Sequence, residues 1–434
     1  MKQLTRLFIP ICLETLFYML SGMVDTLMLS AVGDYAVGAV GTANSYIGIF
    51  IIMFSIISSG MVSVMTQNIG AGRPGVAYQA RQLGLLFNAV AGVLMAVFLF
   101  SGAGAILRMV GIADALYEPA LIYLKIVGGG CILNAVIPIF SSYLRAFGYT
   151  KQPLYATIVG NIANFVMNAV FLFVLHKGVA GVAAATVLSK ILNLCIVLYF
   201  SHKLISAKNS TERITNKTVL GQIVKVGLPS ACETALYNVA MMLVIRFLNQ
   251  MDAEGLNVTA RSYTATISNF SYCVGAALAQ ANAIMTGWHI GAGELEECDR
   301  GTKRAAFVGV CVAVCMETAI VLGSGFIMPL FTDNPEMTAL VRKLLAIDIV
   351  LEIGRVTNLV FGQALKTSGD AVFPAVIAAV FMFVFAVGGT WLFGISMGLM
   401  AVGAYIGLAS DECVRAVGMV WRWKTGKWRT KKLV

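Results

Sequence analysis

The chain has 434 residues, of which 59% are hydrophobic and 12% are charged, with a mean hydropathy of +0.83 and a formal net charge of +10. A soluble domain has about 25% charged residues, so this composition excludes an ordinary soluble protein and predicts a polytopic, all-α membrane protein. The nine cysteines form no CxxC motif and the three histidines are scattered, so no zinc-type ligand cluster is visible, and we expect no metal and no cofactor.

Apolar segments long enough to cross a bilayer core of about 30 Å recur along the whole chain. They predict twelve transmembrane helices, at residues 7–31, 37–66, 82–107, 117–143, 152–175, 178–201, 218–250, 257–287, 302–330, 338–364, 371–395 and 397–421. The longest polar break lies almost at the midpoint. We therefore expect an N-terminal six-helix lobe (1–201), a cytoplasmic linker between the lobes (202–217), a C-terminal six-helix lobe (218–421) and a basic cytoplasmic tail (422–434).

The first predicted span, Leu7 to Ser30, carries two acidic residues, Glu14 and Asp25. They are 11 residues apart, which is close to three helical turns, so both project from one face. Because an ionised carboxylate that faces lipid is costly, this face should look into protein or into a wet cavity, and intramembrane acids are usually functional. The alternative is that both acids are neutral or hydrogen-bonded packing residues.

The basic residues between the spans fall almost entirely on one side of the predicted membrane. If the N-terminus is cytoplasmic, only Arg108, Lys177, Arg342 and Lys343 lie on the opposite side. The positive-inside rule therefore predicts that both termini are cytoplasmic and explains the net charge without a nucleic-acid partner. The tail from Trp421 to Lys432, with three tryptophans among basic residues, is typical of an interfacial membrane anchor.

The two halves of the sequence repeat each other. Three patterns recur in the same order: Pro10-x3-Glu14 as Pro229-x3-Glu233, Ile69-Gly70-Ala71-Gly72 as Ile290-Gly291-Ala292-Gly293, and Leu144-Arg145-x2-Gly148 as Leu365-Lys366-x2-Gly369. Each predicted repeat has an even number of spans, so both halves enter the membrane in the same sense. This arrangement predicts a pseudo-two-fold axis along the membrane normal, with a central site between the halves.

Motifs along nearly the whole chain resemble those of the multidrug and toxic compound extrusion (MATE) transporters. They are Met23-Val24-Asp25-Thr26, Gln67-x2-Gly70-Ala71-Gly72-Arg73, Leu144-Arg145-Ala146-Phe147-Gly148, Asn164-x3-Asn168 and Gly181-x3-Ala185-Thr186. The resemblance implies two six-helix lobes that form a V around a central cavity. It also implies export of organic compounds, driven by a Na⁺ or H⁺ gradient.

The same resemblance implies a coupling-ion site at Asp25, Asn164, Asn168 and Thr186. One carboxylate supplies charge, while amide and hydroxyl oxygens supply neutral ligands for a hard cation. Many relatives carry an Asp where this chain has Asn168, and the missing charge favours H⁺ over Na⁺ as the coupling ion. The alternative is that these polar residues only join helices by hydrogen bonds.

Further charged residues lie within the other predicted spans. Glu352 and Arg355 are spaced i, i+3 and can form a structural ion pair. Arg355 stands where sodium-coupled relatives can have an acid, so a second cation site in the C-terminal half is in doubt. We interpret Glu14 and Glu233, at equivalent repeat positions, as cavity acids that attract cationic substrates; the alternative is packing. The partners of four more charged residues cannot be assigned: Lys190, Arg246, Arg261 and Glu317.

The resulting hypothesis is a monomeric antiporter of organic, cationic, drug-like compounds in a bacterial plasma or inner membrane. A lipid or oligosaccharide–lipid flippase of the same superfamily is the first alternative, although it should have a strongly cationic cavity. The second is an integral membrane enzyme, but paired Asp-rich motifs, HExxH and a P-loop are all absent from the sequence. A channel would need rings of like residues from several repeats.

Overall fold

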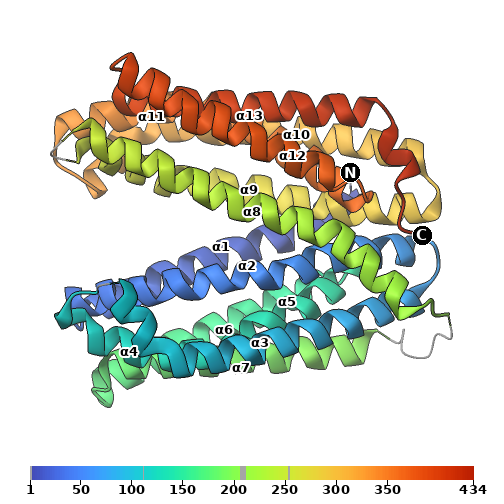
Figure 1. Cartoon of the computed structure of the whole chain (residues 1–434), viewed down its shortest axis with the longest axis horizontal. Coiled ribbons are helices and arrows are strands. Elements are labelled where there is room, and N and C mark those ends of the chain that lie inside the picture. Colours follow the sequence, from blue (N-terminus) through green and yellow to red (C-terminus); the bar gives the residue numbers. More distant parts are fainter. Residues whose placement is uncertain (1, 111, 206–211, 253–254) are drawn as a thin grey trace. The chain divides into compact units, whose positions relative to one another are not determined.

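The computed structural model describes residues 2–110, 112–205, 212–252 and 255–434, and these residues form helices joined by short turns, with no strand among them (Figure 1). Each of the twelve predicted spans coincides with one helix or one interrupted helix, so the all-α prediction is confirmed. Of the described helices, eight are long and apolar enough to cross a membrane, or nine if one bent pair forms a single span. The helices that do not meet this criterion include α11 (Pro335–Thr367) and α13 (Met400–Lys424), which carry charged residues described below.

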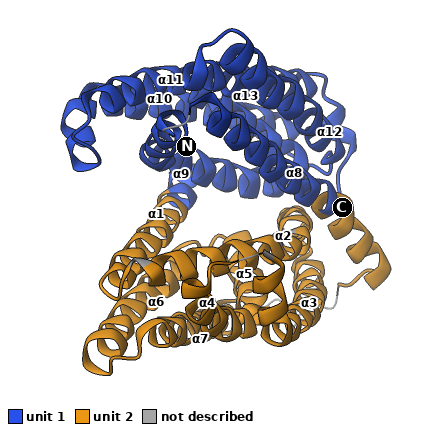
Figure 2. Cartoon of the chain, turned by 60° about the vertical axis from the view of Figure 1, so that its left-hand side comes forward, with its two compact units in different colours: residues 1–8, 228–434 blue, residues 9–227 orange. Residues whose placement is uncertain are grey.

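The chain divides into two compact units, shown in different colours in Figure 2. Unit 2 is Ile9–Gly227, and unit 1 is Met1–Phe8 with Leu228–Val434. The boundaries therefore fall inside the first and eighth helices, whereas the sequence placed the division in the polar segment 202–217. Residues 206–211 of that segment lie outside the described residues.

Unit 2 contains most of α1 and the helices that follow it up to the first turns of α8. Their bounds are α1 Lys2–Ser30, α2 Asp34–Gly70, α3 Pro74–Val110, α4 Asp114–Gly129, α5 Cys131–Ala146, α6 Lys151–Ala169 and α7 Gly178–Leu204. Helices α4 and α5 form one predicted span that is bent by 41° at Gly130. The core is built from small and branched side chains of α2, α3, α4 and α7, such as Ala39, Leu99 and Leu124.

Unit 1 contains the rest of α8 and the five spans after it. Their bounds are α8 Asn216–Met251, α9 Leu256–Ala292, α10 Leu295–Ile327, α11 Pro335–Thr367, α12 Val372–Phe381 and α13 Met400–Lys424. Two π-helical segments, Met382–Val387 and Thr390–Ser396, extend α12. Helix α11 packs against α9, α10 and α13 and so lies at the centre of the unit.

The repeat seen in the sequence is also present in the backbone. After α2, Arg73 N donates to Asn68 O at 2.8 Å, and after α9 Glu294 N donates to His289 O at 2.8 Å. The glycines that these turns share, Gly72 and Gly293, have φ values of 75° and 78°. A left-handed residue at both positions favours glycine, which explains why this part of the motif recurs.

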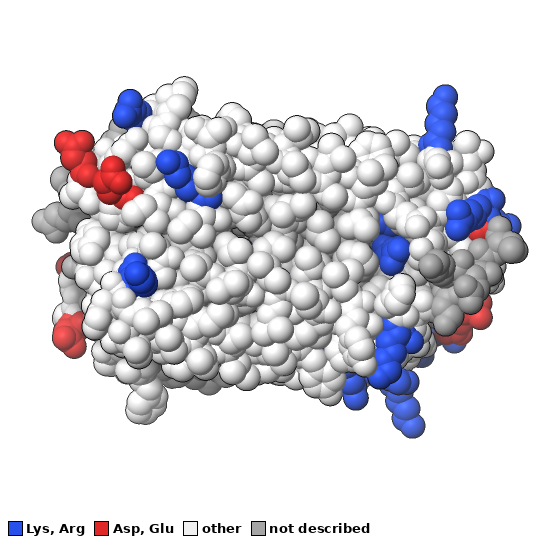
Figure 3. Space-filling view, turned by 90° about the horizontal axis from the view of Figure 1, so that it is seen from below, with Lys and Arg blue, Asp and Glu red and all other residues white. Residues whose placement is uncertain are grey.

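The charged side chains on the surface are distributed unevenly along the helices. On the face in Figure 3, Lys, Arg, Asp and Glu side chains gather near the helix ends, and uncharged surface lies between them. Large apolar side chains such as Leu94, Phe100 and Phe307 are exposed between the helix ends, which is the pattern of lipid-facing helices.

The C-terminal tail folds onto unit 1, which differs from the membrane anchor predicted from its composition. Trp423 and Trp428 are each only 1% exposed, and their rings stack with centroids 4.2 Å apart. Trp423 Nε1 donates to Asp299 Oδ1 at 2.7 Å, and Arg422 pairs with Asp370 at 2.7 Å. The prediction from composition missed this packing because the carboxylates that bind the tail, Asp299 and Asp370, lie far from it in the sequence. Trp421, which is 59% exposed, remains available for an interfacial role.

Candidate functional site

The polar cluster of unit 2 is built around Asp25, which is half-buried on α1. Asn168 on α6 is fully buried, and its Nδ2 donates to Asp25 Oδ1 at 2.8 Å and to Asn164 Oδ1 at 3.1 Å. Asn161 lies one turn before Asn164 on α6, and its Nδ2 donates to Phe17 O at 2.9 Å. The i, i+3, i+7 spacing of the three asparagines places them on one helix face, and this face joins α6 to α1.

The structure thus brings together three of the four residues that the sequence assigned to the coupling site. The fourth, Thr186 on α7, donates its hydroxyl to Val182 O of its own helix at 2.9 Å. Thr186 lies beside Tyr123 of α4, which is buried and close enough to Asp25 to interact with it electrostatically. The sequence did not indicate Tyr123 as a site residue. A tyrosine among apolar residues carries no local signal that could have identified it.

Lys190, whose partner the sequence could not assign, also belongs to this region. Its Nζ donates to Asn134 Oδ1 on α5 at 2.8 Å. It lies close enough to interact electrostatically with Asp25. Among the described residues, the cluster around Asp25 therefore holds one carboxylate, neutral amides and one nearby ammonium group.

The two acids interpreted as cavity acids both lie in ion pairs. Arg145 Nη2 is 2.6 Å from Glu14 Oε1 in unit 2, and Lys366 Nζ is 2.8 Å from Glu233 Oε2 in unit 1. The two bases occupy equivalent positions in the repeat, each three residues before a glycine, Gly148 or Gly369. Each unit therefore contains the same three features: the acid, its basic partner and the turn that follows the partner.

Unit 1 contains a network of acidic and basic side chains from α11 and α13. Arg355 donates to Glu352, and its Nε lies 3.8 Å from Glu412 Oε1. Arg415 donates to both oxygens of Asp411, at 3.0 and 2.6 Å, and pairs with Glu412 at 2.8 Å. The sequence indicated the first pair, but it did not indicate the α13 residues, although Asp411, Glu412 and Arg415 have the i, i+3 and i, i+4 spacing of helical ion pairs.

A group of three acids adjoins this network and shares Glu352 with it. Glu317 on α10, which had no assigned partner, has carboxylate oxygens within 4.8 Å of those of Asp348 and Glu352 on α11. All three residues are buried, and neither oxygen of Glu317 has a hydrogen-bond partner among the described residues. Three carboxylates so close together beside one guanidinium group can take up protons or a hard cation.

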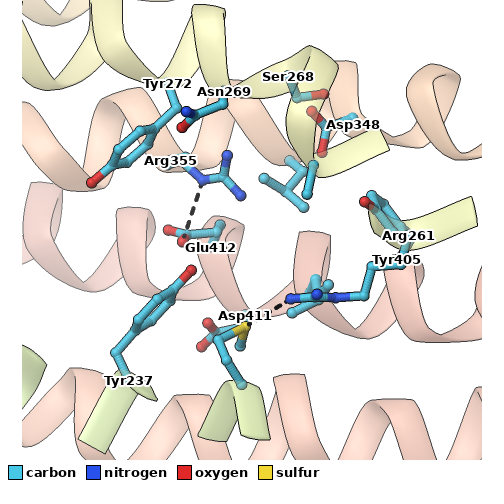
Figure 4. A pocket seen from close by; sticks show the side chains of 14 residues that line it. Tyr237, Arg261, Ser268, Asn269, Tyr272, Asp348, Arg355, Tyr405, Asp411 and Glu412 are labelled. Carbon is cyan, nitrogen blue, oxygen red and sulfur yellow. Dashed lines mark hydrogen bonds and ion pairs between the residues drawn. The ribbon is translucent and has the colours of Figure 1, made fainter. Parts of the chain in front are cut away.

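A pocket of about 270 Å³ opens next to the network, between α8, α9, α11 and α13 (Figure 4). Charged residues from three helices line it, together with the aromatic rings of Tyr237, Tyr272 and Tyr405. Small-molecule sites measure about 300–1,000 Å³, so this pocket suits a small ligand or one part of a larger ligand.

The comparison with protein families agrees with the repeat. The MatE family model matches residues 10–170 and 229–392, which together make up well over half of the chain. The chain belongs to the MATE family. The two matches begin at Pro10 and Pro229, the first residues of the repeat, and each unit contains the whole of one matched segment.

Relatives with curated descriptions cover the chain almost completely. The chain is 32% identical over 428 residues to an uncharacterized transporter, YisQ of Bacillus subtilis, with 97% of this chain and 94% of that protein covered. It is 21% identical over 446 residues to a probable multidrug resistance protein, NorM of Thermotoga maritima, with 100% and 94% covered. MATE proteins are transporters, and this chain is therefore a multi-pass membrane transporter.

Solved structures of the family have the same fold. A mutant of the Vibrio cholerae MATE transporter VcmN superposes with a TM-score of 0.88 at 17% identity, with 99% of this chain and 98% of that chain covered. An outward-facing multidrug resistance MATE transporter of the MOP superfamily superposes with a TM-score of 0.84 at 21% identity, with 98% and 96% covered.

Proposed function

We propose that this MATE transporter exports organic cations by antiport with H⁺, and that Asp25 carries the coupling proton. The observation that supports this proposal is the hydrogen bond of 2.8 Å from Asn168 Nδ2 to Asp25 Oδ1. It places the single acid of the cluster in a shell of neutral amides. One carboxylate suffices to carry one proton, whereas a tight Na⁺ site needs several oxygen ligands, commonly with more than one charged group. Na⁺ is the alternative coupling ion.

Lys190 supports the same choice. When Asp25 is ionised, the ammonium group of Lys190 provides an internal counter-charge that competes with Na⁺ for the carboxylate. A proton neutralises Asp25 by a covalent bond and needs no space for a hydration shell. Asn168, which also bonds Asn164, positions the carboxyl group. Substrate release and proton uptake then bias the same conformational equilibrium.

Glu14 and Glu233 are the proposed contact points for the positive charge of the substrate. Each is paired with a basic side chain, so a bound cation would exchange with Arg145 or Lys366 rather than meet a free carboxylate. The relation to a probable multidrug resistance protein supports drug-like substrates. We expect the protein to act as a monomer.

The proposed location is a bacterial plasma or inner membrane, with both termini in the cytoplasm. The distribution of Lys and Arg between the helices supports this orientation. In a cysteine-free variant, Asp333→Cys in the turn before α11 should react with a membrane-impermeant maleimide added to intact cells. Arg73→Cys in the turn after α2 should react only after lysis, and the reverse pattern would overturn the orientation.

Efflux from proteoliposomes tests the coupling. A panel of organic cations is loaded, and H⁺ and Na⁺ gradients are imposed separately on the wild type and on Asp25→Asn. The variant mimics the protonated state, so it should fold and retain substrate binding but lose gradient-driven efflux. Asp114→Asn, an exposed acid at the start of α4, is the control and should transport normally. Uphill transport that survives in Asp25→Asn would exclude Asp25 as the coupling site.

A further inference from the structure

Two arginines line the unit 1 pocket, Arg261 and Arg355. Among the described residues, only Arg355 forms ion pairs with carboxylates. Arg355 is bound by Glu352 and Glu412. Arg415, just outside the pocket, holds Asp411 and Glu412. The carboxylates of α13 that line the pocket therefore already have guanidinium partners within the network.

Arg261 on α9 has no such partner. Among the described residues, no carboxylate oxygen lies within 4.0 Å of its side-chain nitrogens. Its recorded contact is a weak one from Nη2 to Met241 Sδ at 3.8 Å, drawn as a dashed line in Figure 4. A guanidinium group has five N–H donors in a planar fork, and a half-buried one without an acceptor is a ready site for an anionic group.

An arginine near a helix end can instead extend along the helix toward water. Arg261 lies in the second turn of α9, so this alternative is open to it on position alone. Its contact, however, is with the side chain of Met241 on α8, and both residues line the pocket. The side chain therefore reaches across to the neighbouring helix, inside the cavity.

The pocket also holds a carboxylate without a basic partner. Asp348 is 2% exposed, and its Oδ2 has no hydrogen-bond partner among the described residues. Arg355 and Ser268 lie near enough to interact with it electrostatically, but no basic nitrogen of the described residues lies within 4.0 Å of it. Figure 4 shows Asp348 and Ser268 together, away from the contact between Arg261 and Met241. The exposed rings of Tyr237 and Tyr272 form the accessible part of the wall and can stack on a planar ligand. Among the described residues, the pocket thus has one base and one acid that form no ion pair within 4.0 Å, together with aromatic walls.

We infer that this pocket binds a zwitterionic organic substrate, with the carboxylate of the substrate at Arg261 and its basic nitrogen at Asp348. The inference rests on the proposed export of organic compounds and narrows their class, since a simple lipophilic cation leaves Arg261 unpaired. A planar carboxylate accepts two parallel N–H bonds from guanidinium, so Arg261 selects for this group in a way that a lysine cannot fully reproduce.

Direct binding tests the inference without any ion gradient. The protein is placed in phosphatidylcholine nanodiscs, and calorimetry measures its affinity for 4-(aminomethyl)benzoate, a zwitterion, and for its methyl ester, a cation of nearly the same shape. The wild type should bind the zwitterion at least tenfold more tightly than the ester. Arg261→Gln should remove this preference, and Arg261→Lys should retain part of it. Arg246→Gln, an exposed arginine outside the pocket, should keep it.

Three results would overturn the inference: equal affinity of the wild type for both probes, no binding of either probe, or loss of the preference in Arg246→Gln as well. Displacement of the zwitterion by phosphatidylglycerol added to the nanodiscs would also overturn it, because Arg261 would then hold a lipid headgroup. The comparison of probes on the wild type remains decisive if a variant fails to fold. Absence of gradient-driven efflux would sink the proposed antiport but would leave these binding results intact.

Discussion

Arg145 on α5 places its Nη2 2.6 Å from Oε1 of Glu14 on α1, so the first intramembrane acid of the chain is an ion-pair partner inside unit 2. The same relationship joins Lys366 to Glu233 in unit 1. An ion pair that recurs at equivalent positions of both repeats serves a role common to both. We expect that role to be the reversible binding of positive charge.

The first prediction concerns charge selectivity. Glu14→Gln combined with Glu233→Gln should lower efflux of a lipophilic cation about tenfold more than efflux of a neutral dye, because about 1.4 kcal/mol of lost interaction is tenfold in affinity. Efflux rates of both compounds from proteoliposomes provide the measurement. Glu118→Gln with Glu336→Gln, two exposed acids, is the matched control. If both substrates are affected equally, the ion pairs only stabilise the fold.

The second prediction concerns the Glu352–Arg355 pair. Arg355→Met leaves Glu352 without its basic partner in a buried site, which should cost about 3–5 kcal/mol of stability. The double variant Glu352→Met/Arg355→Met should recover most of this loss, because Glu412 retains Arg415 and Asn358 as partners. Thermal unfolding in detergent measures both effects. A double variant that is stable but cannot transport would show that the pair takes part in the mechanism.

The third prediction concerns the choice of ion. Asn168→Asp adds a second carboxylate beside Asp25 and should increase Na⁺-driven efflux severalfold at constant pH, since hard cations favour sites with more charged oxygen ligands. Efflux under an imposed Na⁺ gradient is the measurement. Asn161→Asp, on the same face of α6 but bonded to Phe17 O, is the control and should not respond. The idea fails if the two variants respond alike.

The fourth prediction concerns the tail. Trp428 is buried against Trp423, and its Nε1 donates to Trp423 O at 3.0 Å. Truncating a buried tryptophan to alanine typically costs about 3–5 kcal/mol, so Trp428→Ala should lower the melting temperature of the purified protein clearly. Trp421 is 59% exposed, so Trp421→Ala should change the melting temperature little. Similar losses from both variants would mean that the tail acts at the membrane interface instead.

The fifth prediction concerns a close approach of two helices within unit 2. A Cβ added at Gly227 would lie 1.8 Å from Ile56 O, so α8 and α2 touch backbone to backbone. Gly227→Ala should therefore sharply reduce the folded yield, because neither backbone can move away cheaply. Gly221→Ala on the same helix meets no atom within 4 Å and should fold normally. Fluorescence-detected size exclusion compares the two, and a normal profile for Gly227→Ala would contradict the packing.

The sequence alone determined the class, the helices and the repeat. These follow from local properties: apolar runs of bilayer length, and glycines at turns whose left-handed backbone favours glycine. The proximity of Asp25 to Asn164 and Asn168 could be expected as well, although only through a resemblance that pairs residues of the first and fifth spans.

Only the tertiary structure decided which charged side chains meet. Glu14 is separated from Arg145 by 131 residues, and Asp299 from Trp423 by 124, so neither contact has a local signature. The same holds for Glu317, Asp348 and Glu352, which two helices bring together, and for Arg261, whose lack of a partner can be seen only when every neighbouring helix is in place. Helix formation depends on residues within a few turns, whereas the pairing of buried charges depends on which helix faces pack together.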